Sequence, residues 1–221
     1  MDVKRGGLAL PWTLVAAYAT TLRPAQLTWG ATSAETEAAL PGDMLLTEAD
    51  LVATRAIGIR APAEQVWPWI AQLGQGRGGF YSYDRLENLA GCEIVSAERI
   101  VPQWQHPAVG DEFRLHPDVR LEVAMVEPGR AFVAWSPPQP ETTATAPYDF
   151  SWAFVLREGR RGGTRLLVRE RYRHRRRWAP LVIEPVALVS FVMTQRMLRG
   201  IRERAERPAP SAPGGASRRV A

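Results

Sequence analysis

The middle of the chain alternates short apolar stretches with turn residues, and this pattern ends in one long amphipathic stretch. Strand-like stretches lie at 94–101, 112–115, 120–126, 131–135, 148–156 and 164–172. Gly110–Asp111, Pro128–Gly129 and Gly162–Gly163 mark turns between them. Consecutive strands joined by turns this short pair antiparallel, and an antiparallel sheet commonly buries one face only. The sequence therefore predicts a meander whose one apolar face needs a cover.

Helical patterns stand on both sides of this meander. Val52–Arg60 reads as a first strand, and Ala63–Gly74 has apolar residues at 66, 67, 70 and 73, the spacing of an amphipathic helix. Tyr83–Ala90 predicts a second short helix and Glu184–Glu206 a long one. The apolar stripe expected on the long helix consists of Val186, Val189, Val192, Met193, Met197 and Ile201. We predict an α+β fold: a curved antiparallel sheet of about six to seven strands wrapped on the C-terminal helix, with two short helices after the first strand.

Alternation sorts the faces of the last two predicted strands. The inner face carries Tyr148, Phe150, Trp152, Phe154 and Leu156 from one strand, and Leu166, Val168, Glu170 and Tyr172 from the next. Glu170 is the one carboxylate on this aromatic face, where a charge needs a partner. Two interpretations stay open: a buried salt bridge to a core arginine, and a polar contact for a ligand in a cavity.

The net charge of +5 is concentrated in one window. Residues 157–177 hold ten arginines and two glutamates, a charge of +8, so the remaining 200 residues sum to −3. Alternation puts Arg165, Arg169, Arg171 and Arg173 on the outer face, which we interpret as solvated. The open alternative is a patch that contacts phosphates or an anionic membrane surface. Nucleic acid is not an expected partner, because neither an RNP-type run nor zinc-finger spacing accompanies the arginines.

The two ends differ from the middle. Residues 1–26 are mostly apolar after a basic start, and three interpretations stay open: a cleaved secretory signal, a membrane anchor and a helix packed on the domain. Residues 27–50 are polar and predict a linker or surface segment, which we call the arm. Residues 51–206 form the domain, and the Pro/Ala/Ser/Gly-rich residues 207–221 predict a disordered tail. Localisation stays open between the cytoplasm, a membrane surface and export.

The order of elements and the segment Ala61–Trp69 (APAEQVWPW) resemble the START-like helix-grip superfamily, SRPBCC. This superfamily includes pollen-allergen-like lipid carriers, START lipid-transfer domains and polyketide cyclases/dehydratases. Further segments resemble a bacterial group of the superfamily that has no assigned activity: Trp29–Thr32, Pro41–Asp43, Thr54–Ile57, Gly74–Asn88 and Ile100–Asp111. The resemblance extends over about residues 27–206 and implies a helix-grip fold, which by itself does not define a function.

In the fold that the resemblance implies, the two short helices lie at the mouth of a cavity. This brings a polar cluster to the mouth, made of Arg77, Tyr81, Tyr83, Asp84, Glu87 and Asn88. Two interpretations of the cluster stay open: a structural network that ties helix to sheet through Arg77, and groups that bind a ligand or act on it. For the second we take Tyr81, Asp84 and Glu170 as candidate acid–base residues. The expected ligand contacts are Arg77, Tyr81, Asp84, Trp104, Gln105, Phe150, Trp152, Phe154, Glu170 and Tyr172. We expect no cofactor and no metal site, because His106, His116 and His174 lack ligand-type spacing.

Three functions follow from these observations. The first is a carrier or sensor that binds a hydrophobic small molecule or lipid in an internal cavity. The second is an enzyme of the polyketide cyclase/dehydratase kind; we lean away from catalysis. The third is a module that contacts a membrane surface or a protein partner through the Arg patch 157–177 or the N-terminal segment.

Overall fold

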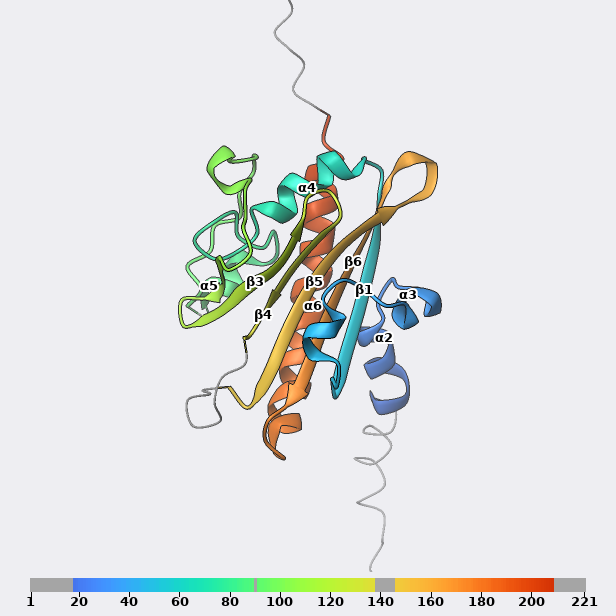
Figure 1. The fold of residues 1–221 in the computed structure, drawn as a ribbon, viewed down its shortest axis with the longest axis vertical. Coiled ribbons are helices and arrows are strands. Elements are labelled where there is room, and N and C mark those ends of the chain that lie inside the picture. The colour runs from blue at the N-terminus through green and yellow to red at the C-terminus, as the bar shows by residue number, and fades with distance from the viewer. Residues whose placement is uncertain (1–17, 90, 138–145, 209–221) are drawn as a thin grey trace, which may run out of the picture.

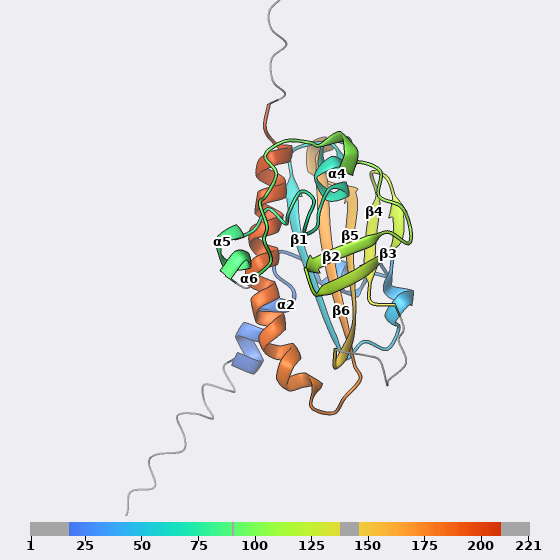
Figure 2. The same cartoon turned by 90° about the vertical axis from the view of Figure 1, so that its left-hand side faces the viewer.

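The computed structural model describes residues 18–89, 91–137 and 146–208, and it has an α+β fold. Six antiparallel strands form one sheet in the order β1-β6-β5-β4-β3-β2, curved around the long C-terminal helix α6 (Figure 1). The fold class predicted from the sequence is confirmed. Turned by 90°, the molecule shows α6 along one side of the sheet and the segment around residues 43–46 on the other (Figure 2).

The strands are β1 (Leu51–Ile59), β2 (Glu112–His116), β3 (Val119–Glu127), β4 (Ala131–Trp135), β5 (Tyr148–Glu158) and β6 (Thr164–His174). The α-helices are α2 (Arg23–Leu27), α3 (Ser33–Glu37), α4 (Ala63–Ala71), α5 (Asp84–Leu89) and α6 (Ala179–Ala205). One π-helical turn, η1 (Tyr18–Leu22), and three 3₁₀ turns complete the described chain: η2 (Asp43–Leu46), η3 (Pro102–Trp104) and η4 (Arg160–Gly162). The two short helices after the first strand are α4 and α5, as expected.

The stretch 94–101, predicted as a strand, is irregular in the structure. Its backbone binds side chains of α5 instead of a neighbouring strand. The Ile94 amide donates to Asn88 Oδ1 at 2.5 Å, and the Ser96 amide donates to Asp84 Oδ2 at 2.8 Å. An apolar stretch without its own ladder partner takes the hydrogen bonds that neighbouring side chains offer.

The long helix begins at Ala179, five residues before the predicted start at Glu184. Its buried face includes Met197 and Ile201 from the predicted stripe but otherwise differs from the prediction, because it runs through Ile183, Ala187, Thr194 and Leu198, whereas Val189 is 63% exposed. The rotation has a physical cause: it turns the hydroxyls of α6 toward the buried carboxylate of Glu170. A buried charge gains more from hydrogen bonds than the molecule loses by exposing a valine.

The arm packs on the outer face of the sheet. Leu40 is buried there against a second apolar cluster formed by Ala56, Val133, Ala153, Val155 and Leu167. A Cβ atom on Gly42, where φ is +89°, would lie 2.7 Å from Val133 Cγ1. The arm therefore lies in direct contact with the central strands, and its small residues permit that approach.

Three of the four outer arginines, Arg165, Arg169 and Arg171, hold the arm in place instead of forming the solvated face expected from alternation. Arg173 pairs with Asp149 of β5 and is 44% exposed. Arg165 forms a bidentate ion pair with Glu35, with both nitrogen–oxygen distances at 2.7 Å. Arg169 is 3% exposed and donates to Asp43, to Thr54 and to three backbone carbonyls of the arm. Alternation found the face correctly but could not show that another segment of the chain covers it.

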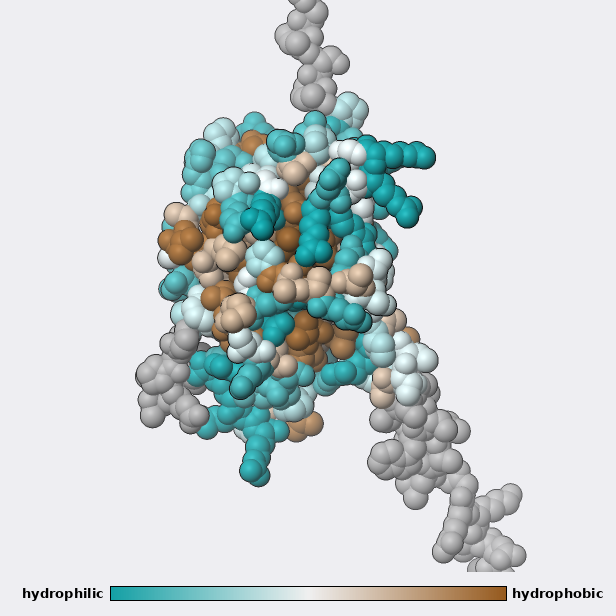
Figure 3. Space-filling model, turned by 45° about the vertical axis from the view of Figure 1, so that its right-hand side comes forward, coloured by the Kyte–Doolittle hydropathy of each residue, from teal (hydrophilic) through white to brown (hydrophobic). Residues whose placement is uncertain are grey.

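The arm also runs beside β1. The Ala56 amide donates to the Trp29 carbonyl at 3.0 Å, and a Cβ atom on Gly30 (φ +71°) would meet the Ala56 carbonyl oxygen at 2.2 Å. Before the arm, Arg23 of α2 pairs with Glu184 of α6 at 2.7 Å. The space-filling view in Figure 3 shows brown hydrophobic patches reaching the surface among the teal side chains on this side of the molecule.

Some expectations fall outside the described residues. Most of the N-terminal segment 1–26 lies in residues 1–17, and most of the predicted tail lies in residues 209–221. The interpretations of both segments stay predictions.

Candidate ligand-binding cavity

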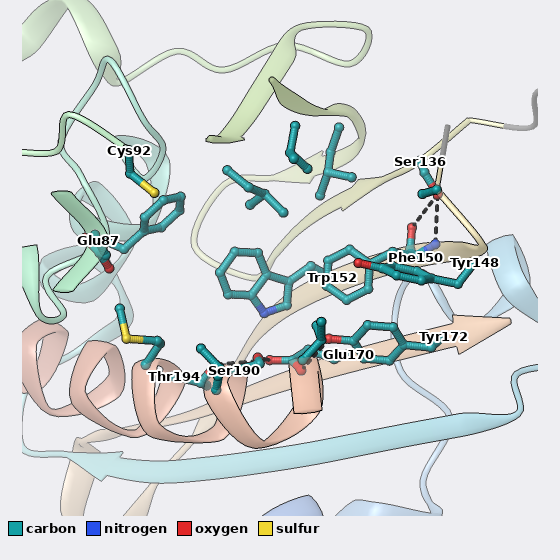
Figure 4. A pocket seen from close by; sticks show the side chains of 18 of the residues that line it. Glu87, Cys92, Ser136, Tyr148, Phe150, Trp152, Glu170, Tyr172, Ser190 and Thr194 are labelled. Carbon is teal, nitrogen blue, oxygen red and sulfur yellow. Dashed lines mark hydrogen bonds between the residues drawn. The ribbon is translucent and has the colours of Figure 1, made fainter. Parts of the chain in front are cut away.

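A cavity of about 890 Å³ lies between the inner face of the sheet and α6. Its walls are mainly aromatic and aliphatic, with contributions from α5, from the β2–β3 turn and from α6 (Figure 4). Phe80, Leu121, Phe150, Trp152, Val186, Met193 and Met197 supply much of the apolar surface. Known small-molecule pockets range from about 300 to 1,000 Å³ and are lined mostly by such side chains.

One part of the wall carries a buried polar cluster around Glu170. Its Oε1 accepts hydrogen bonds from Ser190 Oγ at 2.6 Å and from Thr194 Oγ1 at 3.0 Å. Its Oε2 accepts from the Tyr172 hydroxyl at 3.2 Å. Burial is the main cause that raises the pKa of Tyr172 well above its usual value, with the Glu170 charge adding to it, so this hydroxyl stays a donor. Figure 4 shows these side chains meeting between β6 and α6.

Arg55 supplies the opposite charge. Its Nη1 donates to Glu170 Oε1 at 2.7 Å, and both side chains are 1% exposed. Arg55 Nε also donates to the Gln26 carbonyl at 3.0 Å, which ties α2 to the same cluster. The Glu170 carboxylate therefore accepts hydrogen bonds from four donors at once. Of the two interpretations of Glu170, the salt bridge to a core arginine is present, and the residue lines the cavity as well.

Two polar atoms in the cavity wall are buried without a hydrogen-bond partner among the residues that the structure describes. They are Trp152 Nε1 and Glu87 Oε2. Burial, together with the nearby Asp84 charge, raises the pKa of Glu87 to about 7. An unpartnered buried polar atom costs about 1–3 kcal/mol, and a bound molecule with a matching group would offset that cost.

The structure brings four of the expected ligand contacts to this cavity: Phe150, Trp152, Glu170 and Tyr172. They come from β5 and β6, where Phe150 pairs with Tyr172 and Trp152 pairs with Glu170 in adjacent register. Phe154, from the same face, is fully buried and packs edge-on against Phe132, beyond the cavity wall.

The other expected contacts lie elsewhere and have internal partners. The Tyr81 hydroxyl donates to the Trp69 carbonyl at 3.1 Å, and Asp84 accepts two hydrogen bonds from Ser96. Arg77 donates to the carbonyls of Ala71 and Trp104, and Gln105 donates to Pro68 and Gln72. Arg77 and Trp104 line a second, shallower hollow beside Ile94 and Val101. These residues tie α4, α5 and the 94–105 loop together.

Burial raises the pKa of Tyr81 above its usual range, and its backbone has a φ of +55°. Gly200 of α6 lies so close that a Cβ atom there would be 2.3 Å from the Tyr81 carbonyl oxygen. Arg204 stacks over the Tyr81 ring at 4.7 Å. Tyr81 is therefore a packing residue between the loop and α6.

Glu87, Ser190 and Thr194 are among the polar cavity residues that were not expected as ligand contacts from the sequence. Ser190 and Thr194 are four residues apart on a helix, so they share one face. In the sequence, two hydroxyl side chains at this spacing in an otherwise apolar stretch indicate that both face a polar partner. Glu87 was part of the predicted polar cluster. The neighbouring sequence does not indicate that Glu87, and not Asp84, lines the cavity.

The fold and the cavity define a helix-grip protein with an apolar cavity large enough for a small molecule. No family model matches the chain, and no curated protein matches it. The family resemblance therefore stays a prediction beyond the fold itself. Among the described residues, no group of three or more His, Cys, Asp or Glu side chains is arranged to hold a metal ion.

Several solved structures have a similar arrangement of elements. The protein MLL2253 from Mesorhizobium loti is 15% identical with a TM-score of 0.42, over 72% of this chain and 100% of that one. The hypothetical protein jhp0584 from Helicobacter pylori is 11% identical with a TM-score of 0.47, over 79% and 99%. The di-domain ARO/CYC BexL from the BE-7585A biosynthetic pathway is 14% identical with a TM-score of 0.41, over 75% and 54%. At these identities and scores the likeness carries no information about activity.

Proposed function

We propose that the protein binds an apolar small molecule or lipid in the cavity between the sheet and α6, as a carrier or sensor. The observation that carries the proposal is an apolar cavity of about 890 Å³ whose wall holds two unpartnered polar atoms. A cavity this large with few, fixed polar groups is typical of ligand sites.

The polar atoms indicate the kind of molecule. The Trp152 indole N–H needs an acceptor, and Glu87, when protonated, can donate as well as accept. The ligand is therefore expected to have a largely apolar body with oxygen-bearing groups, such as a carbonyl and a hydroxyl. An isolated charge on the ligand would gain no partner from Glu170, because Arg55 already neutralises that carboxylate.

Native mass spectrometry of gently purified protein, followed by displacement with a fluorescent fatty acid, tests the proposal. Val186 lines the cavity from α6, and Val186→Phe places a larger ring in the cavity. We expect this variant to weaken probe binding about tenfold or more, since the ring excludes part of the ligand. Val109→Phe is the matched control, because Val109 is 64% exposed and lies outside the cavity wall. Wild-type protein that binds no probe, or a Val186→Phe variant that binds it as well as wild type, contradicts the proposal.

A second function, acid–base catalysis of the cyclase/dehydratase kind, depends on Glu87. Tyr81, Asp84 and Glu170 have internal partners, whereas Glu87 has a free buried oxygen and a pKa of about 7. A carboxyl group with this pKa can give and take protons at neutral pH. Incubation with the molecule recovered by mass spectrometry tests this: conversion that disappears in Glu87→Gln while binding persists supports catalysis, and an unchanged molecule contradicts it.

A further inference from the structure

The first half of α6 exposes an apolar stripe. Trp178, Leu181, Leu188, Val189 and Val192 are 53%, 78%, 45%, 63% and 42% exposed. At 100° per residue these positions fall within an arc of about 100°, opposite to the buried face through Ile183, Ala187 and Thr194. By length and composition α6 could cross a membrane, and only 28% of its most apolar 18-residue window is buried. The helix is therefore apolar on two sides, and the sheet covers one of them.

The stripe is continuous with the mouth of the cavity. Leu188, Val189 and Val192 contribute to the cavity wall although they are exposed. In addition, α5 exposes Leu86 and the start of β3 exposes Val119, at 54% and 48%, and both also line the cavity. Exposed apolar side chains therefore surround the opening from three elements, which a soluble monomer rarely tolerates without a function.

Two arginines lie at the start of the stripe. Arg176 and Arg177 are exposed and directly precede Trp178. A basic pair, an interfacial tryptophan and an apolar helical stripe are the combination that binds the surface of an anionic bilayer. The arginine pair complements the negative surface of such a bilayer, whereas the same stripe and arginine pair on a second copy would supply no opposite charge.

The N-terminal part of the described chain contacts the same half of α6. The Tyr18 hydroxyl donates to Glu184 of α6 at 3.5 Å, and Arg23 binds the same carboxylate. The sequence just before Tyr18 is the apolar run Leu8–Ala17. Tyr18 and Arg23 therefore lie against the half of α6 that carries the stripe.

We propose that this surface, the α6 stripe with Arg176 and Arg177, docks on an anionic lipid bilayer with the cavity mouth turned toward the lipid. Docking itself does not depend on the cavity ligand. Only the exchange of a ligand with the bilayer rests on the function proposed above.

Flotation of the full chain with vesicles tests the proposal, using phosphatidylcholine alone and phosphatidylcholine mixed with phosphatidylglycerol. Trp178→Ser/Leu181→Ser lies on the stripe outside the cavity wall and is expected to lower binding to the mixed vesicles about tenfold or more. Arg176→Gln/Arg177→Gln is expected to lower it about tenfold on the mixed vesicles only. Met44→Ser (83% exposed on η2) and Arg157→Gln/Arg160→Gln at the far end of the β5–β6 hairpin are the controls and should bind as wild type does.

The outcomes separate docking from ligand binding. In vesicle-free buffer, Trp178→Ser/Leu181→Ser should bind the fluorescent fatty acid normally, and Val186→Phe should lose the probe while still floating with vesicles. Wild type that floats but binds no probe supports docking and contradicts the cavity function. Stripe variants that float as well as wild type overturn the proposal, because the N-terminal run then suffices. Self-association that the stripe variant abolishes, with no flotation of wild type, also overturns it and indicates a second copy as the occupant.

Discussion

Glu87 makes the protein sensitive to pH near neutrality. Its pKa of about 7 in the folded protein lies above the ordinary value of 4.5, so the folded state binds the extra proton. The free energy of unfolding therefore falls as the pH rises between these two values. We expect Glu87→Gln to be more stable than wild type by about 2 kcal/mol at pH 8 and equal to it at pH 4. Urea unfolding at both pH values measures this difference.

The matched control for this effect is Asp84→Asn, because Asp84 is a neighbouring acid whose two oxygens accept from Ser96. Loss of one of these hydrogen bonds should destabilise that variant at pH 4 as well as at pH 8, and loss of the Asp84 charge should also reduce the pH dependence that Glu87 causes. A Glu87→Gln variant that is less stable than wild type at pH 8 contradicts the expected ionisation.

The Arg55–Glu170 pair is the second prediction at the residue level. Both side chains are 1% exposed, so removal of one partner leaves an unpaired buried charge. We expect Arg55→Met to destabilise the protein by about 3–5 kcal/mol and Arg55→Met/Glu170→Met to regain most of that loss. Thermal or urea unfolding measures both. A double variant as unstable as the single one shows that the other hydrogen bonds of the cluster, and not the charge, carry the stability.

At the level of elements, Arg169 joins the arm to β6. It donates to Asp43 at 2.7 Å and to the carbonyls of Glu35, Thr36 and Ala38. We expect Arg169→Ala to cost about 3 kcal/mol and to open the arm to proteases, because several buried acceptors lose their donor at once. Limited proteolysis, read by mass spectrometry, locates the cuts. Arg157→Ala, at an exposed position, should change neither stability nor the cleavage pattern.

Low pH should weaken the same contact between the arm and β6. The Arg165 guanidinium holds the pKa of Glu35 at about 2, below its ordinary 4.5. The stabilisation is therefore present above pH 4.5 and is lost as the pH falls toward 2. Faster proteolysis of the arm at pH 3 than at pH 6, measured with an acid-tolerant protease and corrected for its own pH dependence, is the expected result.

The sequence predicts elements where a pattern repeats. The alternation in β5 and β6 placed Phe150, Trp152, Glu170 and Tyr172 on one face, and the register confirms that face. The sequence pattern could not predict which face of α6 is buried, because the helix is apolar on two sides. The position of Glu170 selects which side turns inward. The pattern missed the irregular 94–101 segment for a related reason, since side chains of Asp84 and Asn88 bind backbone amides from outside the segment.

At the scale of the whole molecule, the architecture follows from the strand order and the cavity does not. Neighbouring strands pair in chain order from β2 to β6, so turn signals suffice to predict most of the sheet. The cavity depends on the distance between α6 and the sheet, which contacts such as Gly200 with Tyr81 and Arg55 with Glu170 fix. These contacts join residues far apart in the chain, and a single sequence carries no signal for them.

The hydrogen bond between the Trp29 carbonyl and β1 affects how the protein is expected to behave in solution. β1 is the terminal strand of the sheet, and one of its outward amides, that of Ala56, is already bonded to the arm. A strand with free outward amides is a template on which another polypeptide can add by β-pairing. The arm occupies that template at Ala56, and Gly30 lets it approach closely enough to do so. A chain with a detached arm is therefore expected to aggregate through the edge of β1 even while its cavity and sheet stay folded.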